Sequence, residues 1–126
     1  MPLGDHVLDN GLTVLDTEAN RLDICHTLPT TYVEATSTYT VGNKTSLSVG
    51  APAAGSPNGR KVTVAQITDG MITATSTDTS DDAQFWALTD TVNSRLLAAG
   101  SLASAQMVTS GNTFTLGAFD IRIPSE

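Results

Sequence analysis

The 126-residue chain has the length of a single domain, residues 1–126, and carries 13 acidic and 6 basic residues for a net charge of −7. The basic residues are too few and too scattered to hold a phosphate backbone, so we expect no nucleic-acid partner. The sequence opens without a cationic and apolar leader, and no apolar run reaches about 18 residues. We therefore expect no membrane insertion and no secretion, and we infer synthesis in a cytoplasm.

The composition favours β-strands. The chain contains 20 Thr and 11 Ser, and β-branched Thr fits a pleated, half-exposed surface. Only 15% of the residues are charged, which is unlike the composition of disordered chains. Cys25 is the single cysteine, so the fold contains no internal disulfide.

The start of the chain predicts an arm over residues 1–4 and an amphipathic helix over residues 5–20. Asp5 is the expected N-cap of this helix. The helix can either cover its own sheet or offer a contact surface to another protein. Its apolar residues recur at helical spacing and are Val7, Leu8, Leu12 and Leu15.

Residues 21–25 alternate between apolar and polar side chains, which predicts a half-buried strand with Leu22 and Ile24 facing the core. The spacing of Thr31 and Glu34 matches a capping box and predicts a short helical turn over residues 32–35. A second strand is expected over residues 40–49.

Residues 50–59 contain only Gly, Ala, Pro, Ser and Asn and predict a flexible surface loop. Strands are expected over residues 61–67 and 71–77. The intervening residues 68–70, Thr-Asp-Gly, predict a hairpin turn between them.

The segment FWALTDTVNSRLLAAG, residues 85–100, predicts the hairpin around which the fold is organised. Alternation along its first strand places Trp86 and Leu88 on the core face, and Phe85 on the other face. The turn residues between the two strands are Asp, Thr, Asn and Ser, which tolerate chain reversal.

The last strand, residues 113–123, changes its apolar parity between Leu116 and Phe119. Either a β-bulge near residues 117–118 restores both groups to one core, or the strand crosses between two sheets.

These elements predict a mainly β fold, an antiparallel β-sandwich or small barrel of about seven or eight strands with one N-terminal helix. The expected core consists of Leu22, Ile24, Val62, Val64, Trp86, Leu88, Leu96, Phe114, Leu116, Phe119 and Ile121.

Patterns of reactive residues predict neither a catalytic site nor a cofactor site. Asp78, Asp81 and Asp82 lack the spacing of a calcium loop. Cys25 and His26 would need two further zinc ligands, and His6 is the only other histidine. No nucleophile elbow or phosphate loop occurs in the sequence. We therefore expect a protein that is not an enzyme and holds no metal or cofactor.

Two segments carry a resemblance to a known family. They are NRLDICHTLPTTYVEATSTYTVGNKT, residues 20–45, and FWALTDTVNSRLLAAGSLASAQMVTSGNTFTL, residues 85–116. The chain resembles the head decoration, or cement, proteins of tailed bacteriophages. The resemblance implies a non-enzymatic structural protein, made in the bacterial host cytoplasm, that sits on the outer capsid surface and bridges major capsid subunits, often as a homotrimer. The acidic charge suits the outer surface better than the DNA-filled interior.

Terminal arms and loops are the segments expected to contact the capsid in such a protein. The predicted interface residues are Met1, Pro2, Leu3, Gly4, Ala51, Pro52, Ala53 and Ala54. An alternative role in the same virion is a tail or head-to-tail connector component. A further alternative is a carbohydrate-binding module with Trp86, Tyr32 or Tyr39 as stacking platforms, which would require an exposed aromatic ring over a polar groove.

Overall fold

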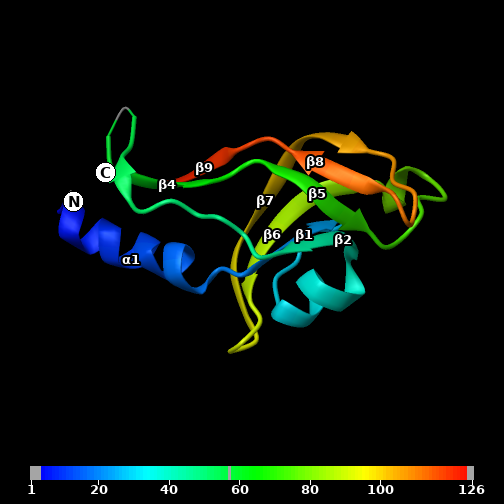
Figure 1. Cartoon of the computed structure of the whole chain (residues 1–126), viewed down its shortest axis with the longest axis horizontal. Helices are drawn as coiled ribbons and strands as arrows, with labels where there is room; N and C mark the ends of the chain where they lie inside the picture. Colours follow the sequence, from blue (N-terminus) through cyan, green and yellow to red (C-terminus); the bar gives the residue numbers. More distant parts are fainter. Residues whose placement is uncertain (1–3, 57, 125–126) are drawn as a thin grey trace.

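The computed structural model describes residues 4–56 and 58–124, and within these residues it contains nine strands, one long helix and two short helical turns (Figure 1). All the strand pairs are antiparallel. The predicted fold class is therefore confirmed, with nine strands where seven or eight were expected. In chain order the elements are α1 (Asp5–Glu18), β1 (Arg21–Cys25), η1 (Glu34–Thr38), β2 (Thr40–Thr45), β3 (Ala53–Ala54), β4 (Arg60–Val64), β5 (Ile67–Ile72), η2 (Thr79–Asp81), β6 (Ala83–Asp90), β7 (Arg95–Gln106), β8 (Thr113–Leu116) and β9 (Phe119–Ile123).

The strands form two sheets. The larger sheet has the order β7-β6-β1-β2-β5-β8 and curls into a half-barrel. The smaller sheet has the order β3-β4-β9. In Figure 1 the smaller sheet and α1 lie together at one end of the molecule, where the two chain termini also lie.

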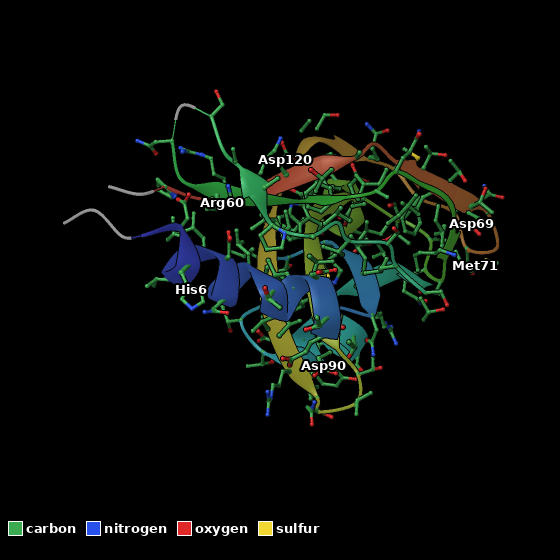
Figure 2. All side chains as sticks on the ribbon, turned by 60° about the vertical axis from the view of Figure 1, so that its left-hand side comes forward. His6, Arg60, Asp69, Met71, Asp90 and Asp120 are labelled. Atoms are coloured by element: carbon green, nitrogen blue, oxygen red, sulfur yellow. The ribbon has the colours of Figure 1, made fainter. Side chains whose placement is uncertain are left out.

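Helix α1 packs along β4 of the smaller sheet. Its residues Leu8, Leu12 and Leu15 are buried in this contact. Arg60 of β4 donates from Nε to the Asp9 carboxylate at 2.7 Å and fixes the helix to the strand. Figure 2 shows Arg60 above the helix and His6 on the opposite face. The prediction of Asp5 as N-cap was wrong: Gly4 occupies that position, and Asp5 lies in the first turn, where its negative charge suits the helix dipole.

Strand β1 has the predicted bounds but is buried on both faces. Leu22 and Ile24 face the core, as expected, and Asp23 and Cys25 are also fully buried. The chain between β1 and β2 includes the π-helical turn η1, where the buried Ala35 carbonyl accepts a hydrogen bond from the Cys25 thiol at 3.6 Å. The predicted capping contact is present, because Thr31 Oγ1 accepts the backbone N–H of Glu34 at 3.2 Å.

The predicted hairpin is formed by β6 and β7 around residues 91–94. Asp90 fixes the turn, because its carboxylate accepts the backbone N–H groups of Val92 and Asn93. Strand β7 is longer than expected and continues to Gln106.

The chain crosses between the two sheets three times. Residues 46–52 lead from β2 in the larger sheet to β3 in the smaller one, residues 65–66 lead from β4 to β5 in the larger sheet, and residues 117–118 lead from β8 back to β9. The parity change in the last strand is therefore a crossing and not a bulge. The hairpin turn predicted at residues 68–70 was wrong, because these residues lie inside β5, where Gly70 pairs with Phe114 of β8.

Two predicted segment boundaries also change. Strand β2 ends at Thr45, so residues 46–49 are not a continuation of it, although Val49 makes an isolated bridge to Val64. The segment 50–59, predicted as a loop, contains the short strand β3, which pairs with the start of β4.

The core lies between α1, the smaller sheet and the inner face of the half-barrel. Of the predicted core residues, Leu22, Ile24, Val62, Val64 and Leu88 are buried. Trp86, Phe114, Leu116, Phe119 and Ile121 are partly buried and pack against the core. Leu96 lies outside the core cluster, whereas its neighbour Leu97 packs against it, because the register between β6 and β7 shifts at Leu88 and Thr89.

Gly70 of β5 gives a direct test of this packing. The Phe114 ring of β8 lies across Gly70, so a methyl group at this position would overlap the ring. We expect Gly70→Ala to lower the free energy of unfolding by about 1–3 kcal/mol. Gly117→Ala is the matched control, because nothing lies within 4 Å of an added methyl group there.

Chemical denaturation of both variants measures the difference. A second variant, Gly70→Ala with Phe114→Leu, should lose less than the sum of its two single changes, because the smaller side chain relieves the overlap. Equal stability of Gly70→Ala and Gly117→Ala would contradict the packing described here.

Candidate functional site

A groove opens where the half-barrel fails to close. It runs between β7, at one edge of the larger sheet, and β8 and the β8–β9 crossing on the other side. Two adjoining hollows of about 390 and 450 Å³ make up this groove, and Leu102, Ala103 and Leu116 line both. We call it the seam groove. The first hollow, of about 390 Å³, reaches the core at Ile24 and Ile72, and the second, of about 450 Å³, is lined by Trp86 and Phe119.

Strand β7 departs from regular pairing where it borders the seam groove. Ser101 pairs with Phe85 and Gln106 pairs with Ala83, so the four residues 102–105 of β7 face only Gln84 of β6. This irregularity is a large β-bulge, which leaves backbone N–H and C=O groups without partners in the neighbouring strand. The outer edge of β7 pairs with no other strand among the described residues.

The lining of the seam groove carries a single charged side chain. No Asp, Glu, Lys, Arg or His occurs from Leu96 to Phe119, although the chain has a net charge of −7. The one charged residue that lines the groove is Asp120, at the end of the second hollow. Its carboxylate accepts hydrogen bonds from Thr63 Oγ1 at 2.6 Å and Lys61 Nζ at 3.0 Å, which lower the pKa of Asp120.

Met107 stands beside this groove as an exposed apolar side chain. It lines the first hollow, yet 79% of its surface is accessible. The neighbouring Val108 is buried in the core. The same neutral surface therefore carries both an apolar depression and an apolar projection.

Trp86 and Phe119 lie under the second hollow and pack on one another, with ring centroids 4.7 Å apart. The indole also lies against Gly100 of β7, where an added Cβ would be 2.8 Å from Trp86 Cζ2. One face of the ring system is thus occupied by protein. Tyr39 contacts the His26 ring edge-on at 5.5 Å. Trp86 and Tyr39 are both partly buried, so neither ring is the fully exposed platform that the carbohydrate-binding alternative requires.

A buried polar cluster lies around β1. Arg21 donates from Nε and Nη2 to the two Asp23 carboxylate oxygens at 2.8 and 2.9 Å. Thr40 Oγ1 donates to the same carboxylate at 2.6 Å. Burial raises the pKa of Asp23, and the hydrogen bonds from Arg21 and Thr40 oppose that shift. Because all three groups satisfy one another, this cluster stabilises the fold.

Cys25 is not a reactive thiol. It is fully buried beside the same cluster, and burial, together with the Asp23 charge, raises its pKa to about 12. A thiolate is the nucleophilic and metal-binding form of cysteine, so Cys25 stays protonated in the folded protein at neutral pH.

The acidic run before β6 forms a local turn. Asp78 caps η2 by accepting the backbone N–H of Ser80 at 2.8 Å, and Asp81 accepts that of Thr77 at 3.2 Å. The hydrogen bonds from Thr77 lower the pKa of Asp81. Within residues 4–56 and 58–124, no group of three or more His, Cys, Asp or Glu side chains is placed to hold a metal ion.

The described part of the predicted interface, Gly4 and residues 51–54, does not line the seam groove. Met1, Pro2 and Leu3 fall outside the described residues, and Gly4 is the exposed N-cap of α1. Ala51 is exposed and Pro52 is half-buried, whereas Ala53 and Ala54 form the exposed edge strand β3. The seam groove itself was missed by sequence reasoning, although the uncharged run from residue 96 to 119 was a visible signal.

The comparisons with known proteins add no further constraint: no family model, curated protein or solved structure matches this chain. None of the helices among the described residues is both long and apolar enough to cross a membrane.

Proposed function

We propose that this chain is a non-enzymatic structural protein of a tailed-phage virion that decorates the outer capsid surface and bridges major capsid subunits. The observation that carries the proposal is the seam groove, a neutral and apolar depression on an otherwise acidic chain. Contiguous exposed apolar surface of this kind is typical of protein contact sites.

The bulged edge of β7 suits a protein partner in particular. Backbone N–H and C=O groups at an unpaired strand edge can hydrogen-bond to an extended segment of another chain. An uncharged segment is the fitting partner, because burying a charge against Leu102, Phe114 and Leu116 would cost free energy without an opposite charge nearby.

The family resemblance supports the same role. The two segments that carry it, residues 20–45 and 85–116, supply β1, β2, β6, β7 and β8, which are five of the six strands of the half-barrel. The resemblance therefore falls on the part of the fold that forms the seam groove. The net charge of −7 also suits the outside of a shell filled with DNA.

A tail or head-to-tail connector is the second candidate. The seam groove is bordered by two unlike strand edges, β7 and β8. Pairing between unlike surfaces of neighbouring copies is heterologous and can close into a ring. The presence of two unlike strand edges at the seam groove is therefore the observation that favours a connector.

Cryo-electron microscopy of the purified particle, with symmetry imposed on the head, separates these candidates. We expect density for this chain at repeated lattice sites outside the shell. A ring at the portal or tail would favour the connector. Absence of the chain from the particle would overturn the proposal.

A further inference from the structure

We propose that the seam groove binds a second copy of this chain, with Met107 of each copy inserted into the groove of the other. This inference rests on the proposed use of the seam groove as an assembly surface and names its occupant. It follows from the shape, the charge and the position of the residues on this one surface.

The shape is self-complementary. Met107 projects with 79% of its surface exposed, directly beside a hollow of about 390 Å³ that reaches Ile24, Ile72 and Phe114. A flexible, unbranched Met side chain can fill an irregular apolar hollow and contact an aromatic ring favourably. Projection and hollow thus match in chemistry.

Their proximity selects a two-fold arrangement. Because Met107 itself lines the hollow, a copy that receives the partner's Met107 simultaneously presents its own to the same partner. Such a reciprocal contact is isologous and forms a closed dimer. A three-fold assembly would require each copy to receive one neighbour and insert into another, through surfaces that lie apart.

The charge distribution explains why the second copy would choose this surface. Two chains that each carry a charge of −7 repel one another. None of the residues that line the first hollow is charged, and Asp120 in the second hollow is paired with Lys61, so facing copies bring few like charges together within the groove. The small exposed residues Ala103, Ser104 and Ala105 also allow the two backbones to approach.

The test begins with the full chain in solution, by light scattering coupled to size exclusion and by sedimentation over a range of concentrations. We expect a species of twice the 13.1 kDa chain mass that dissociates on dilution. Met107→Asp should shift the dissociation constant upward at least tenfold, whereas Met107→Leu should leave it within about threefold, because an apolar side chain is retained.

Val92→Asp is the matched control. Val92 is also an exposed apolar residue, at 82%, but it lies in the turn at residues 91–94, the yellow loop at the bottom of Figure 1, remote from β8. The Val92→Asp variant adds the same negative charge as Met107→Asp but does not touch the seam groove, so it should leave the dimer intact. A cooperative unfolding transition in each of the two aspartate variants would show that both remain folded.

Oxidation by dilute peroxide, followed by peptide mass mapping, provides a second readout. Met107 should become protected as the protein concentration rises, and Met71, at 48% exposure on β5, should not. A monomer at all concentrations, a trimer, or equal weakening by Met107→Asp and Val92→Asp would overturn the inference.

The outcomes for this inference and for the proposed function are separable. A monomeric chain that is still found on the capsid would remove the dimer and leave the decoration role. A Met107-dependent dimer that is absent from the particle would support the dimer and overturn the decoration role.

Discussion

Arg21→Ala is expected to lower the free energy of unfolding by about 3–5 kcal/mol, the range for breaking a buried ion pair from one side. Asp23 is fully buried and receives two of its hydrogen bonds from Arg21, at 2.8 and 2.9 Å. The variant would leave the carboxylate with Thr40 as its remaining side-chain donor. Urea denaturation at neutral pH, followed by tryptophan fluorescence, measures the loss.

The double variant Arg21→Met with Asp23→Leu is the control. It replaces both charges with apolar side chains, and such replacements of buried pairs are often neutral or stabilising. We expect it to recover most of the stability lost in Arg21→Ala. If Arg21→Ala unfolds at the wild-type midpoint, the ion pair contributes nothing and our interpretation of this cluster is wrong.

The same variant should respond to pH in a defined direction. Burial already raises the pKa of Asp23, and removing Arg21 removes hydrogen bonds that oppose the shift. A carboxyl group whose pKa is higher in the folded than in the unfolded state binds a proton on folding, so stability rises as the pH falls through the folded pKa. The deficit of Arg21→Ala relative to wild type should therefore be largest at neutral pH and shrink in acid, toward the unfolded value of about 3.9. A deficit that grows in acid would contradict this assignment.

Trp86→Ala is expected to cost about 3 kcal/mol, the lower end of the range for removing a large aromatic side chain from a core. Trp86 is partly buried, but it packs on Phe119 across the two sheets and on Gly100 within the hairpin. Its removal would therefore weaken the contact that joins β6 to the smaller sheet. Thermal and chemical unfolding followed by circular dichroism are the suitable measurements, because the variant lacks the only Trp.

Phe85→Ala is the matched comparison for Trp86→Ala. Phe85 precedes Trp86 on β6, is also partly buried, and lies outside the core cluster. Its removal should cost clearly less. If the two variants are equally destabilised, the assignment of the two faces of β6 is wrong.

The sequence predicted the fold best where side-chain alternation and turn residues agreed. Both signals coincide in the β6–β7 hairpin, where Leu88 is buried and Asp90 begins the turn, although Ala87 and Thr89 on the other face are buried as well. The parity change before Phe119 was informative for the same reason, because a crossing between sheets exchanges the face that meets the core.

Prediction failed where tertiary contacts overrode the local pattern. Thr68, Asp69 and Gly70 are turn-forming residues, yet they lie inside β5 because Gly70 accommodates the Phe114 ring of β8. Asp23 was expected on an exposed face, and it is buried because Arg21 and Thr40 neutralise and saturate it. Neither partner is identifiable from alternation alone.

The seam groove could not have been located from the sequence, because it exists where the two edge strands of the larger sheet, β7 and β8, do not pair. The uncharged run around Met107 was visible, but nothing local indicates that β7 and β8 end up at opposite edges of one curled sheet. The bulge at residues 102–105 likewise depends on the register with β6.

The smaller sheet imposes an order on folding. Strand β4 pairs with β9, which follows it by about sixty residues, and α1 at the start of the chain packs on β4. Contacts of such large sequence separation form late and slow the folding reaction. During synthesis, β4 must therefore wait for β9 to leave the ribosome, and until then the sheet on which α1 packs lacks one of its three strands. A chain truncated before Phe119 would leave β4 as an unpaired edge, so such fragments are expected to aggregate and not to accumulate as a smaller folded domain.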